Sequence, residues 1–157
     1  MRIGIHVDTE GIEETVDDLE DIADRGKDFR PVFRKIADDV AKSSAENFTA
    51  QGLLVGGWAP LDAEYAAWKS KHAPGAPPMI RSGNLFRSVS QSRGVALDIN
   101  KHRASYGTKV EYAKFHQYGT TKMPKRQIIF VPQDADREWS GMAKDYVVDG
   151  RSGLANE

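Results

Sequence analysis

The sequence predicts an α+β fold in which a small, mostly antiparallel sheet packs against one long core helix, with additional short helices and extended loops. Two observations predict it. An apolar stripe of helical period covers about residues 29 to 48, and runs of alternating apolar residues occur in the second half of the chain. The length of 157 residues is typical of one compact domain, so we expect a single domain over residues 1–149 and a flexible tail over 150–157.

The first thirty residues predict a short strand followed by an acidic helix. Residues 3–7 alternate apolar with small or polar side chains, which is typical of a strand. In residues 12–25 the apolar positions recur every three or four residues, at Ile12, Val16, Leu19, Ile22 and Ala23. This spacing predicts a narrow apolar stripe with a strongly acidic opposite face. The carboxylates have no EF-hand spacing, so they indicate a solvated helix face and not a calcium site.

Two longer helices carry apolar residues at helical spacing. The core helix is expected from Phe29 to Phe48, and Pro31 suits its first turn, where a missing amide proton has no intrahelical partner. Its predicted buried face consists of Phe29, Val32, Phe33, Ile36, Val40, Ala41, Ala45 and Phe48. The same periodicity predicts a last helix over residues 134–148.

Glycine and proline divide the middle of the chain. The glycines of residues 49–60 predict a loop, which ends in Trp58-Ala-Pro-Leu61. A helix is expected over residues 62–71, with Asp62 as its N-cap and with Tyr65 and Trp68 on one side. After the proline-rich residues 73–78, Ser82 is expected to cap another short helix.

The second half of the chain contains the predicted sheet. Residues 94–100 and 104–108 are expected to pair as a hairpin, and residues 127–131 form a further β-prone run bounded by prolines. Residues 112–118 predict a short helix that Gly119 ends with a left-handed cap.

The charges are separated along the chain, although the net charge is only −1. Residues 8–28 hold ten acidic residues against Arg25 and Lys27, whereas residues 69–126 hold twelve basic residues against Asp98 and Glu111. Opposite patches on one chain favour head-to-tail contacts between copies over self-paired dimers. The basic residues are interleaved with aromatic ones, so a small DNA-binding protein that uses residues 69–126 remains the alternative.

Composition and motifs argue against an enzyme, a metal site or a cofactor. The chain has no cysteine, and its four histidines, including His116, have no metal-ligand spacing. Ser82 lacks a nucleophile elbow, and no third group for a triad is recognisable, so a helix cap and a packed histidine explain Ser82 and His116 better. No apolar run approaches the length of a membrane span, and we expect a chain made in the cytoplasm without a targeting segment.

Four motifs occur in order along the chain. They are Trp58-Ala-Pro-Leu61 leading to Tyr65, Ser82-Gly83-Asn-Leu85, Tyr112-Ala-Lys-Phe-His116-Gln117-Tyr118-Gly119, and Pro124-Lys-Arg126. In this order and spacing they resemble the virion morphogenesis and tail-completion proteins of tailed phages. That group includes the tail-completion family of phage P2 and the Mu morphogenesis protein, with similar minor tail and head-tail joining proteins of the HK97 type. The family usually has a further proline and an aromatic residue after Arg126, whereas this chain continues with Gln127-Ile-Ile-Phe130.

The resemblance implies a structural protein of the head-tail junction of the virion. It implies a ring, commonly hexameric, that contacts the tail-tube or terminator protein and the neck or head-completion proteins, with DNA passing through without sequence-specific binding. In such a ring we expect Tyr112, His116 and Tyr118 to support the fold, and Gly119 to allow the turn into the loop around Pro124. The candidate interface residues are Lys122, Lys125 and Arg126. Pro60 and the other motif residues named above are expected to be structural.

Overall fold

The computed structural model describes residues 10–91 and 96–151. In this part of the chain it contains six α-helices, one short 3-10 helix and two strands, which confirms the α+β class. Their order is α1 (Glu10–Arg25), α2 (Arg30–Thr49), η1 (Leu53–Val55), α3 (Ala63–His72), α4 (Asn84–Ser90), β1 (Ala96–Ile99), β2 (Ala104–Gly107), α5 (Ala113–Tyr118) and α6 (Ala135–Asp149). The predicted strand over residues 3–7, residues 94 and 95 of the predicted hairpin and residues 152–157 of the predicted tail lie outside the described residues.

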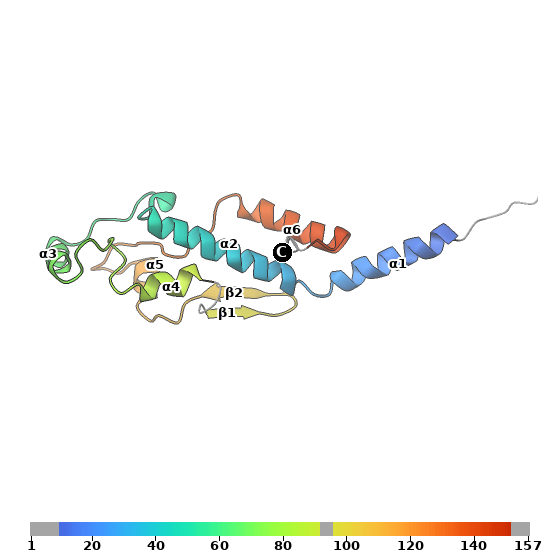
Figure 1. Ribbon diagram of the computed structural model, residues 1–157, viewed down its shortest axis with the longest axis horizontal. Coiled ribbons are helices and arrows are strands. Elements are labelled where there is room, and N and C mark those ends of the chain that lie inside the picture. The colour runs from blue at the N-terminus through green and yellow to red at the C-terminus, as the bar shows by residue number, and fades with distance from the viewer. Residues whose placement is uncertain (1–9, 92–95, 152–157) are drawn as a thin grey trace, which may run out of the picture.

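Helix α2 is the axis of an elongated molecule (Figure 1). It begins as predicted, with Pro31 in its first turn. Helix α6 lies along one side of α2, and α4 with the hairpin lies along the other (Figure 1). Because α2 is covered on two sides, its buried residues are not confined to the predicted stripe. Four residues of that stripe are only half-buried, namely Phe29, Phe33, Ile36 and Ala45. The fully buried residues of α2 are Val32, Ala37, Val40, Ala41, Ser44, Asn47 and Phe48.

The two strands form the predicted antiparallel hairpin. Leu97 pairs with Tyr106 and Ile99 pairs with Ala104. The Tyr106 hydroxyl donates a hydrogen bond to the Val89 carbonyl at 2.8 Å, and this bond fastens the hairpin to the end of α4. The sheet therefore packs on the core through α4 as well as through α2.

The core lies where the far end of α2 meets α4 and α5. It consists of Phe48, Leu85, Val89, Ala113 and Ile128, all at most 4% exposed. The Phe48 ring forms edge-to-face contacts with two other rings, that of Trp58 at 5.1 Å between centroids and that of Phe86 at 5.4 Å. Such aromatic pairs stabilise a fold by about 0.5–1.5 kcal/mol each beyond the area they bury.

Two local predictions were wrong. Residues 127–131 form no strand: they have no regular secondary structure, Ile129 lies at a bend, and they pair with neither strand of the described part of the chain. Helix α4 has Gly83 at its N-cap, with φ of 77°, in place of Ser82. The Ser82 hydroxyl still accepts the Asn84 amide proton at 3.4 Å, so the serine supports the turn before the helix and not the helix cap itself.

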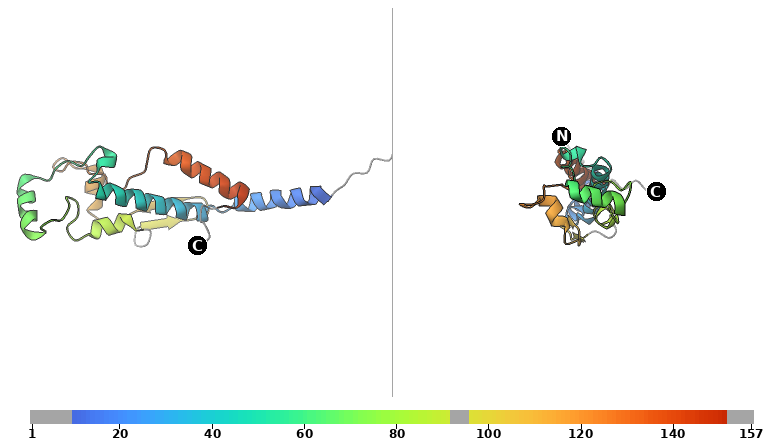
Figure 2. Two further views of the ribbon diagram at one scale, coloured as in Figure 1. Left: turned by 45° about the horizontal axis from the view of Figure 1, so that its top comes forward. Right: turned by 90° about the vertical axis from the view of Figure 1, so that its left-hand side faces the viewer.

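Helix α1 points away from the rest of the molecule beyond the start of α2 (Figures 1 and 2). Its last residue, Arg25, donates hydrogen bonds to the carbonyls of Val147 (2.8 Å) and Val148 (3.1 Å) in the last turn of α6. A cation at a helix C-terminus also interacts favourably with the negative end of the helix dipole. This contact anchors the base of α1 to α6.

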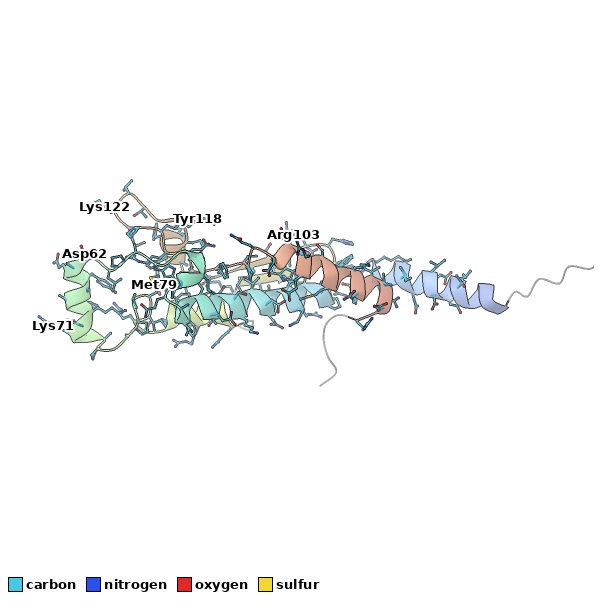
Figure 3. All side chains as sticks on the ribbon, turned by 90° about the horizontal axis from the view of Figure 1, so that it is seen from above. Asp62, Lys71, Met79, Arg103, Tyr118 and Lys122 are labelled. Atoms are coloured by element: carbon cyan, nitrogen blue, oxygen red, sulfur yellow. The ribbon has the colours of Figure 1, made fainter. Side chains whose placement is uncertain are left out.

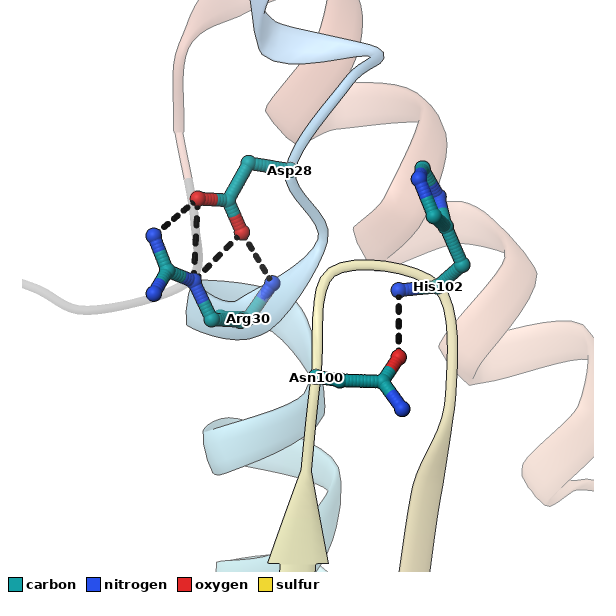
Figure 4. A network of polar contacts seen from close by, with 4 residues as sticks. All are labelled: Asp28, Arg30, Asn100 and His102. Carbon is teal, nitrogen blue, oxygen red and sulfur yellow. Dashed lines mark hydrogen bonds and ion pairs between the residues drawn. The ribbon is translucent and has the colours of Figure 1, made fainter.

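The junction between α1 and α2 is fixed by local polar contacts (Figure 4). The Asp28 carboxylate accepts hydrogen bonds from the Arg30 guanidinium and, to a smaller effect, from the Arg30 amide, and these bonds lower the pKa of Asp28 to about 2. The Phe29 amide donates to the Lys101 carbonyl in the hairpin turn at 3.0 Å. In that turn the Asn100 side chain accepts the His102 amide proton. The start of α2 is thereby tied to the hairpin.

The acidic helix is confirmed, but its apolar stripe is not buried. Val16 is 47% exposed and Leu19 is 59% exposed. Over residues 10–91 and 96–151, no helix combines the length and the hydropathy needed to cross a membrane.

Candidate functional site

The segment of residues 127–131, which follows Arg126, is held by side chains in place of a neighbouring strand. The Gln127 carbonyl accepts hydrogen bonds from Asn47 Nδ2 at 3.0 Å and Trp58 Nε1 at 2.9 Å. The Phe130 amide donates to Ser44 Oγ at 3.3 Å. Ser44 and Asn47 are fully buried on α2, so two polar residues of the core helix replace part of a strand ladder.

Gln117 on α5 supplies the largest share of these bonds. Its Oε1 accepts the amide protons of Ile128 at 2.9 Å and Ile129 at 3.0 Å, and its Nε2 donates to the Ile129 carbonyl at 3.3 Å. The His-Gln-Tyr-Gly motif thus positions the segment that follows the Pro-x-Arg motif.

Arg126 joins three of the sequence motifs. It is 5% exposed, and its guanidinium donates to the carbonyls of Ala59 at 2.9 Å and Pro60 at 2.7 Å. Its own amide donates to the His116 carbonyl at 2.7 Å. Arg126 was predicted as an interface residue, but its guanidinium is buried and bonds to the protein's own backbone. Lys122 and Lys125 are exposed.

His116 is half-buried beside Arg126 and meets the Tyr112 ring edge-on, with 6.1 Å between centroids. Burial and then the Arg126 charge lower the pKa of His116, so the neutral imidazole is favoured. Ser82 and His116 both line one groove, but their side chains form no hydrogen bond with each other. The Ser82 hydroxyl accepts the Asn84 amide proton instead. Tyr118, expected to support the fold, is 79% exposed instead.

Gly119 makes the turn out of α5 possible. Its φ is 76° as expected, but its ψ of 177° is far from the left-handed helical value predicted from the sequence. A Cβ at this position would lie 2.9 Å from the Lys125 amide nitrogen and 3.2 Å from the Met123 carbonyl oxygen. The loop of residues 120–125 therefore folds back against the glycine backbone.

The motif residues surround a groove of about 760 Å³ at the α3 end of the molecule. Ten of the fourteen predicted motif residues line it, namely Pro60, Leu61, Tyr65, Ser82, Gly83, Leu85, Tyr112, His116, Pro124 and Arg126. Trp58, Gln117, Tyr118 and Gly119 do not. The lining also includes Met79, Arg81 and Met123, which no motif indicated. Figure 3 shows Asp62, Met79 and Lys122 at this end, far from α1.

Helix α3 forms one end of the groove and is held by Lys69. The ammonium of Lys69 donates to the carbonyls of Pro77 and Pro78, the second at 2.8 Å, and only 4% of the residue is exposed. Burial lowers the pKa of Lys69. Composition indicated a surface charge for this lysine, because hydrogen bonds to backbone carbonyls leave no signal in composition.

Aromatic rings stack along α3. The Tyr65 and Trp68 rings stack with 5.7 Å between centroids, and the Trp68 and His72 rings with 4.4 Å. The Arg81 guanidinium lies over Trp68 at 5.8 Å, which connects α3 to the segment before α4. In the described part of the chain, no group of three or more carboxylate or imidazole side chains is arranged to hold a metal ion.

Comparison with known proteins identifies the family. Residues 7–147 match the model of the phage virion morphogenesis family. Over 139 residues the chain is 30% identical to Mu-like prophage FluMu G protein 1 of Haemophilus influenzae. The aligned region covers 88% of this chain and 90% of that protein. It is 27% identical over 138 residues to FluMu G protein 2 of the same organism, at 83% and 87% coverage. No solved structure matches. From the ordered motifs and the extent of these matches, the chain belongs to the phage virion morphogenesis family.

Proposed function

We propose that this chain is a structural protein of the head-tail junction, which completes the tail or joins it to the head as a ring of about six subunits. Family membership supports a structural role in the virion of a tailed phage. The ring and its place at the junction rest on the resemblance and on the distribution of charge. The partners are the tail-tube or terminator protein and the neck or head-completion proteins, and DNA passes through the ring without sequence-specific binding.

One observation carries this proposal. The acidic helix α1 and the groove lie at opposite ends of an elongated chain, and exposed lysines such as Lys71 and Lys122 lie at the groove end (Figures 1 and 3). A contact that joins one end to the other is head-to-tail and closes a ring when the rotation between subunits returns to the first subunit, whereas two equal ends repel each other.

A catalytic role has no comparable support. The polar motif residues Gln117 and Arg126 bond to the protein's own backbone. Lys69 and Arg126 are buried, so two of the basic residues on which the DNA-binding alternative rested are not available to a phosphate backbone. We therefore propose that the chain is not an enzyme and that its basic groove end contacts protein.

Charge reversal tests the proposed role. In a phage that encodes this chain, Lys122→Glu with Lys125→Glu is expected to leave heads and tails unjoined in electron micrographs. The control, Lys42→Glu with Lys144→Glu, makes the same charge change at exposed positions of α2 and α6 and is expected to give normal particles. Normal particles from both variants would contradict a junction role for the loop.

The mass of the purified chain tests the ring. Light scattering is expected to find a ring-sized species, either in the chain alone or after mixing with the cognate tail-tube or neck protein. A monomer in both samples would overturn the ring. DNA binding that weakens steeply between low and physiological salt would support the DNA-binding alternative instead.

A further inference from the structure

We infer that the groove at the α3 end binds helix α1 of the neighbouring copy of this chain. This inference rests on the proposed ring, and it names the two surfaces that would form each subunit contact. It follows from four features of the structure: an uncovered amphipathic helix, a groove of matching polarity, complementary charge and the placement of the two at opposite ends.

The occupant is defined by α1. Val16 and Leu19 are three positions apart, so their exposed side chains lie together on one face of the helix. Asp17, Asp18 and Glu20 flank them and are exposed. Asp17 and Asp18 form no ion pair with any residue that the structure describes, in contrast to Asp21 and Asp24 nearer the base. An amphipathic helix with such anchors is one recurring kind of ligand for an apolar groove.

The groove offers the complementary surface. Its apolar lining includes Leu61, Met79 and Met123, and methionine side chains adapt readily to an inserted side chain. Its volume of about 760 Å³ lies within the range of known binding clefts and exceeds what two aliphatic side chains require.

The charged groups of the groove favour an acidic ligand. Arg81, Lys122 and Arg126 line it, against one carboxylate, that of Asp62. Arg126 is turned toward the carbonyls of Ala59 and Pro60. The Asp62 carboxylate accepts the amide protons of Glu64 and Tyr65 at the start of α3. Arg81 and Lys122 are exposed and remain to meet the carboxylates of α1.

Geometry makes this contact intermolecular. Helix α1 extends from the start of α2, and the groove lies beyond the end of α2, which at 20 residues is about 30 Å long. Arg25 ties the base of α1 to α6, so α1 cannot fold back into the groove of its own chain without breaking that contact. Pairing of two α1 helices would bring like charges together, which is unfavourable.

Cross-linking tests the contact directly, because the chain has no cysteine of its own. Leu19→Cys and Met123→Cys chains carrying different tags are mixed at a concentration that assembles the ring and then oxidised. A disulfide between the two tagged chains is expected. Leu19→Cys mixed with Lys42→Cys, an exposed position on α2, is the control and is expected to give none. Disulfides predominantly between two Leu19→Cys chains would overturn the inference in favour of paired α1 helices.

Binding of a peptide provides a measurement that does not require assembly. A labelled peptide of residues 10–28 is titrated with the dilute full-length chain, and fluorescence anisotropy reports binding. Changing both Val16 and Leu19 to serine, which leaves the peptide charge unaltered, is expected to weaken binding at least tenfold. Equal binding of the two peptides would show that the apolar stripe is not the anchor and would overturn the inference.

Variants of the full-length chain test the groove side. Arg81→Glu with Lys122→Glu is expected to weaken peptide binding at least tenfold. Lys42→Glu with Lys144→Glu, an equal change in net charge, is expected to alter it less than twofold, and an equal effect of both pairs would refute the groove as the site. Rings that form without the cross-link or the peptide binding would remove this inference and leave the proposed function. Cross-links and peptide binding without rings would support the contact between α1 and the groove and would overturn the proposed ring.

Discussion

Replacing Gln117 with alanine removes the side chain that holds the unpaired segment after Arg126. The truncation eliminates two hydrogen bonds accepted by Oε1, at 2.9 and 3.0 Å, and one donated by Nε2 at 3.3 Å. The Ile129 carbonyl keeps a second donor, Gln127 Nε2 at 3.2 Å. The amides of Ile128 and Ile129 lose their only partners in the described part of the chain, so the loss concerns mainly these two donors.

The expected cost follows from that loss. Leaving a buried donor unsatisfied costs about 1–3 kcal/mol. Gln117 is half-buried, and water can enter the space left by its side chain, which places the cost toward the lower part of the range. We expect Gln117→Ala to lower the free energy of unfolding by about 2–4 kcal/mol, since two donors are affected.

Urea unfolding followed by far-UV circular dichroism measures this loss. For a chain of this size the expected change corresponds to a fall in the melting temperature of roughly 4–16 °C. The control is Gln133→Ala at an exposed position of the next turn, which is expected to change stability by less than about 0.5 kcal/mol. A loss below about 1 kcal/mol for Gln117→Ala, or one equal to that of the control, would refute the view that Gln117 replaces a strand.

Three further predictions concern the same region. Arg126→Lys is expected to lower the free energy of unfolding by about 1–3 kcal/mol, because an ammonium cannot reproduce the forked donation to the two carbonyls. A wild-type free energy of unfolding, measured in urea, would contradict this prediction. Gly119→Ala is expected to lower the free energy of unfolding by about 1–3 kcal/mol, because a Cβ would meet the Lys125 backbone at 2.9 Å and the positive φ disfavours alanine. Thermal unfolding measures this loss. The lowered pKa of His116 means that the folded chain binds fewer protons there than the unfolded chain, so its contribution to stability is present above pH 6.5 and is lost as the pH falls below it. His116→Gln should therefore reduce the drop in melting temperature between pH 7.5 and 5.5, and an unchanged drop would show that other groups cause it.

The sequence alone determined the elements whose signals are local. The apolar period of α2, the Pro31 start and the Asp62 cap of α3 were predicted, and the structure confirms them. The hairpin was also predicted, because alternation and a short turn are neighbouring features. The ordered motifs indicated the family, which the matches to related proteins confirm.

Only the tertiary structure decided how polar groups in the second half of the chain are satisfied. The β-prone run after Arg126 has no strand partner among residues 10–91 and 96–151, because its backbone bonds to Ser44 and Asn47, 86 and 80 positions away. Lys69 and Arg126 count as surface charge in composition, yet their bonds to backbone carbonyls bury them. A hydrogen-bond partner formed by distant backbone has no residue-type signature, so no local pattern could have indicated it.

The exposure of side chains was decided in the same way. Periodicity predicted the apolar stripe of α1, but it could not show that Val16 and Leu19 are left exposed by the parts of the chain that the structure describes. Tyr118 was expected to pack and is exposed, although it follows the half-buried Gln117 directly. Local periodicity fixes which residues share a face of a helix, whereas burial depends on which distant elements pack against that face.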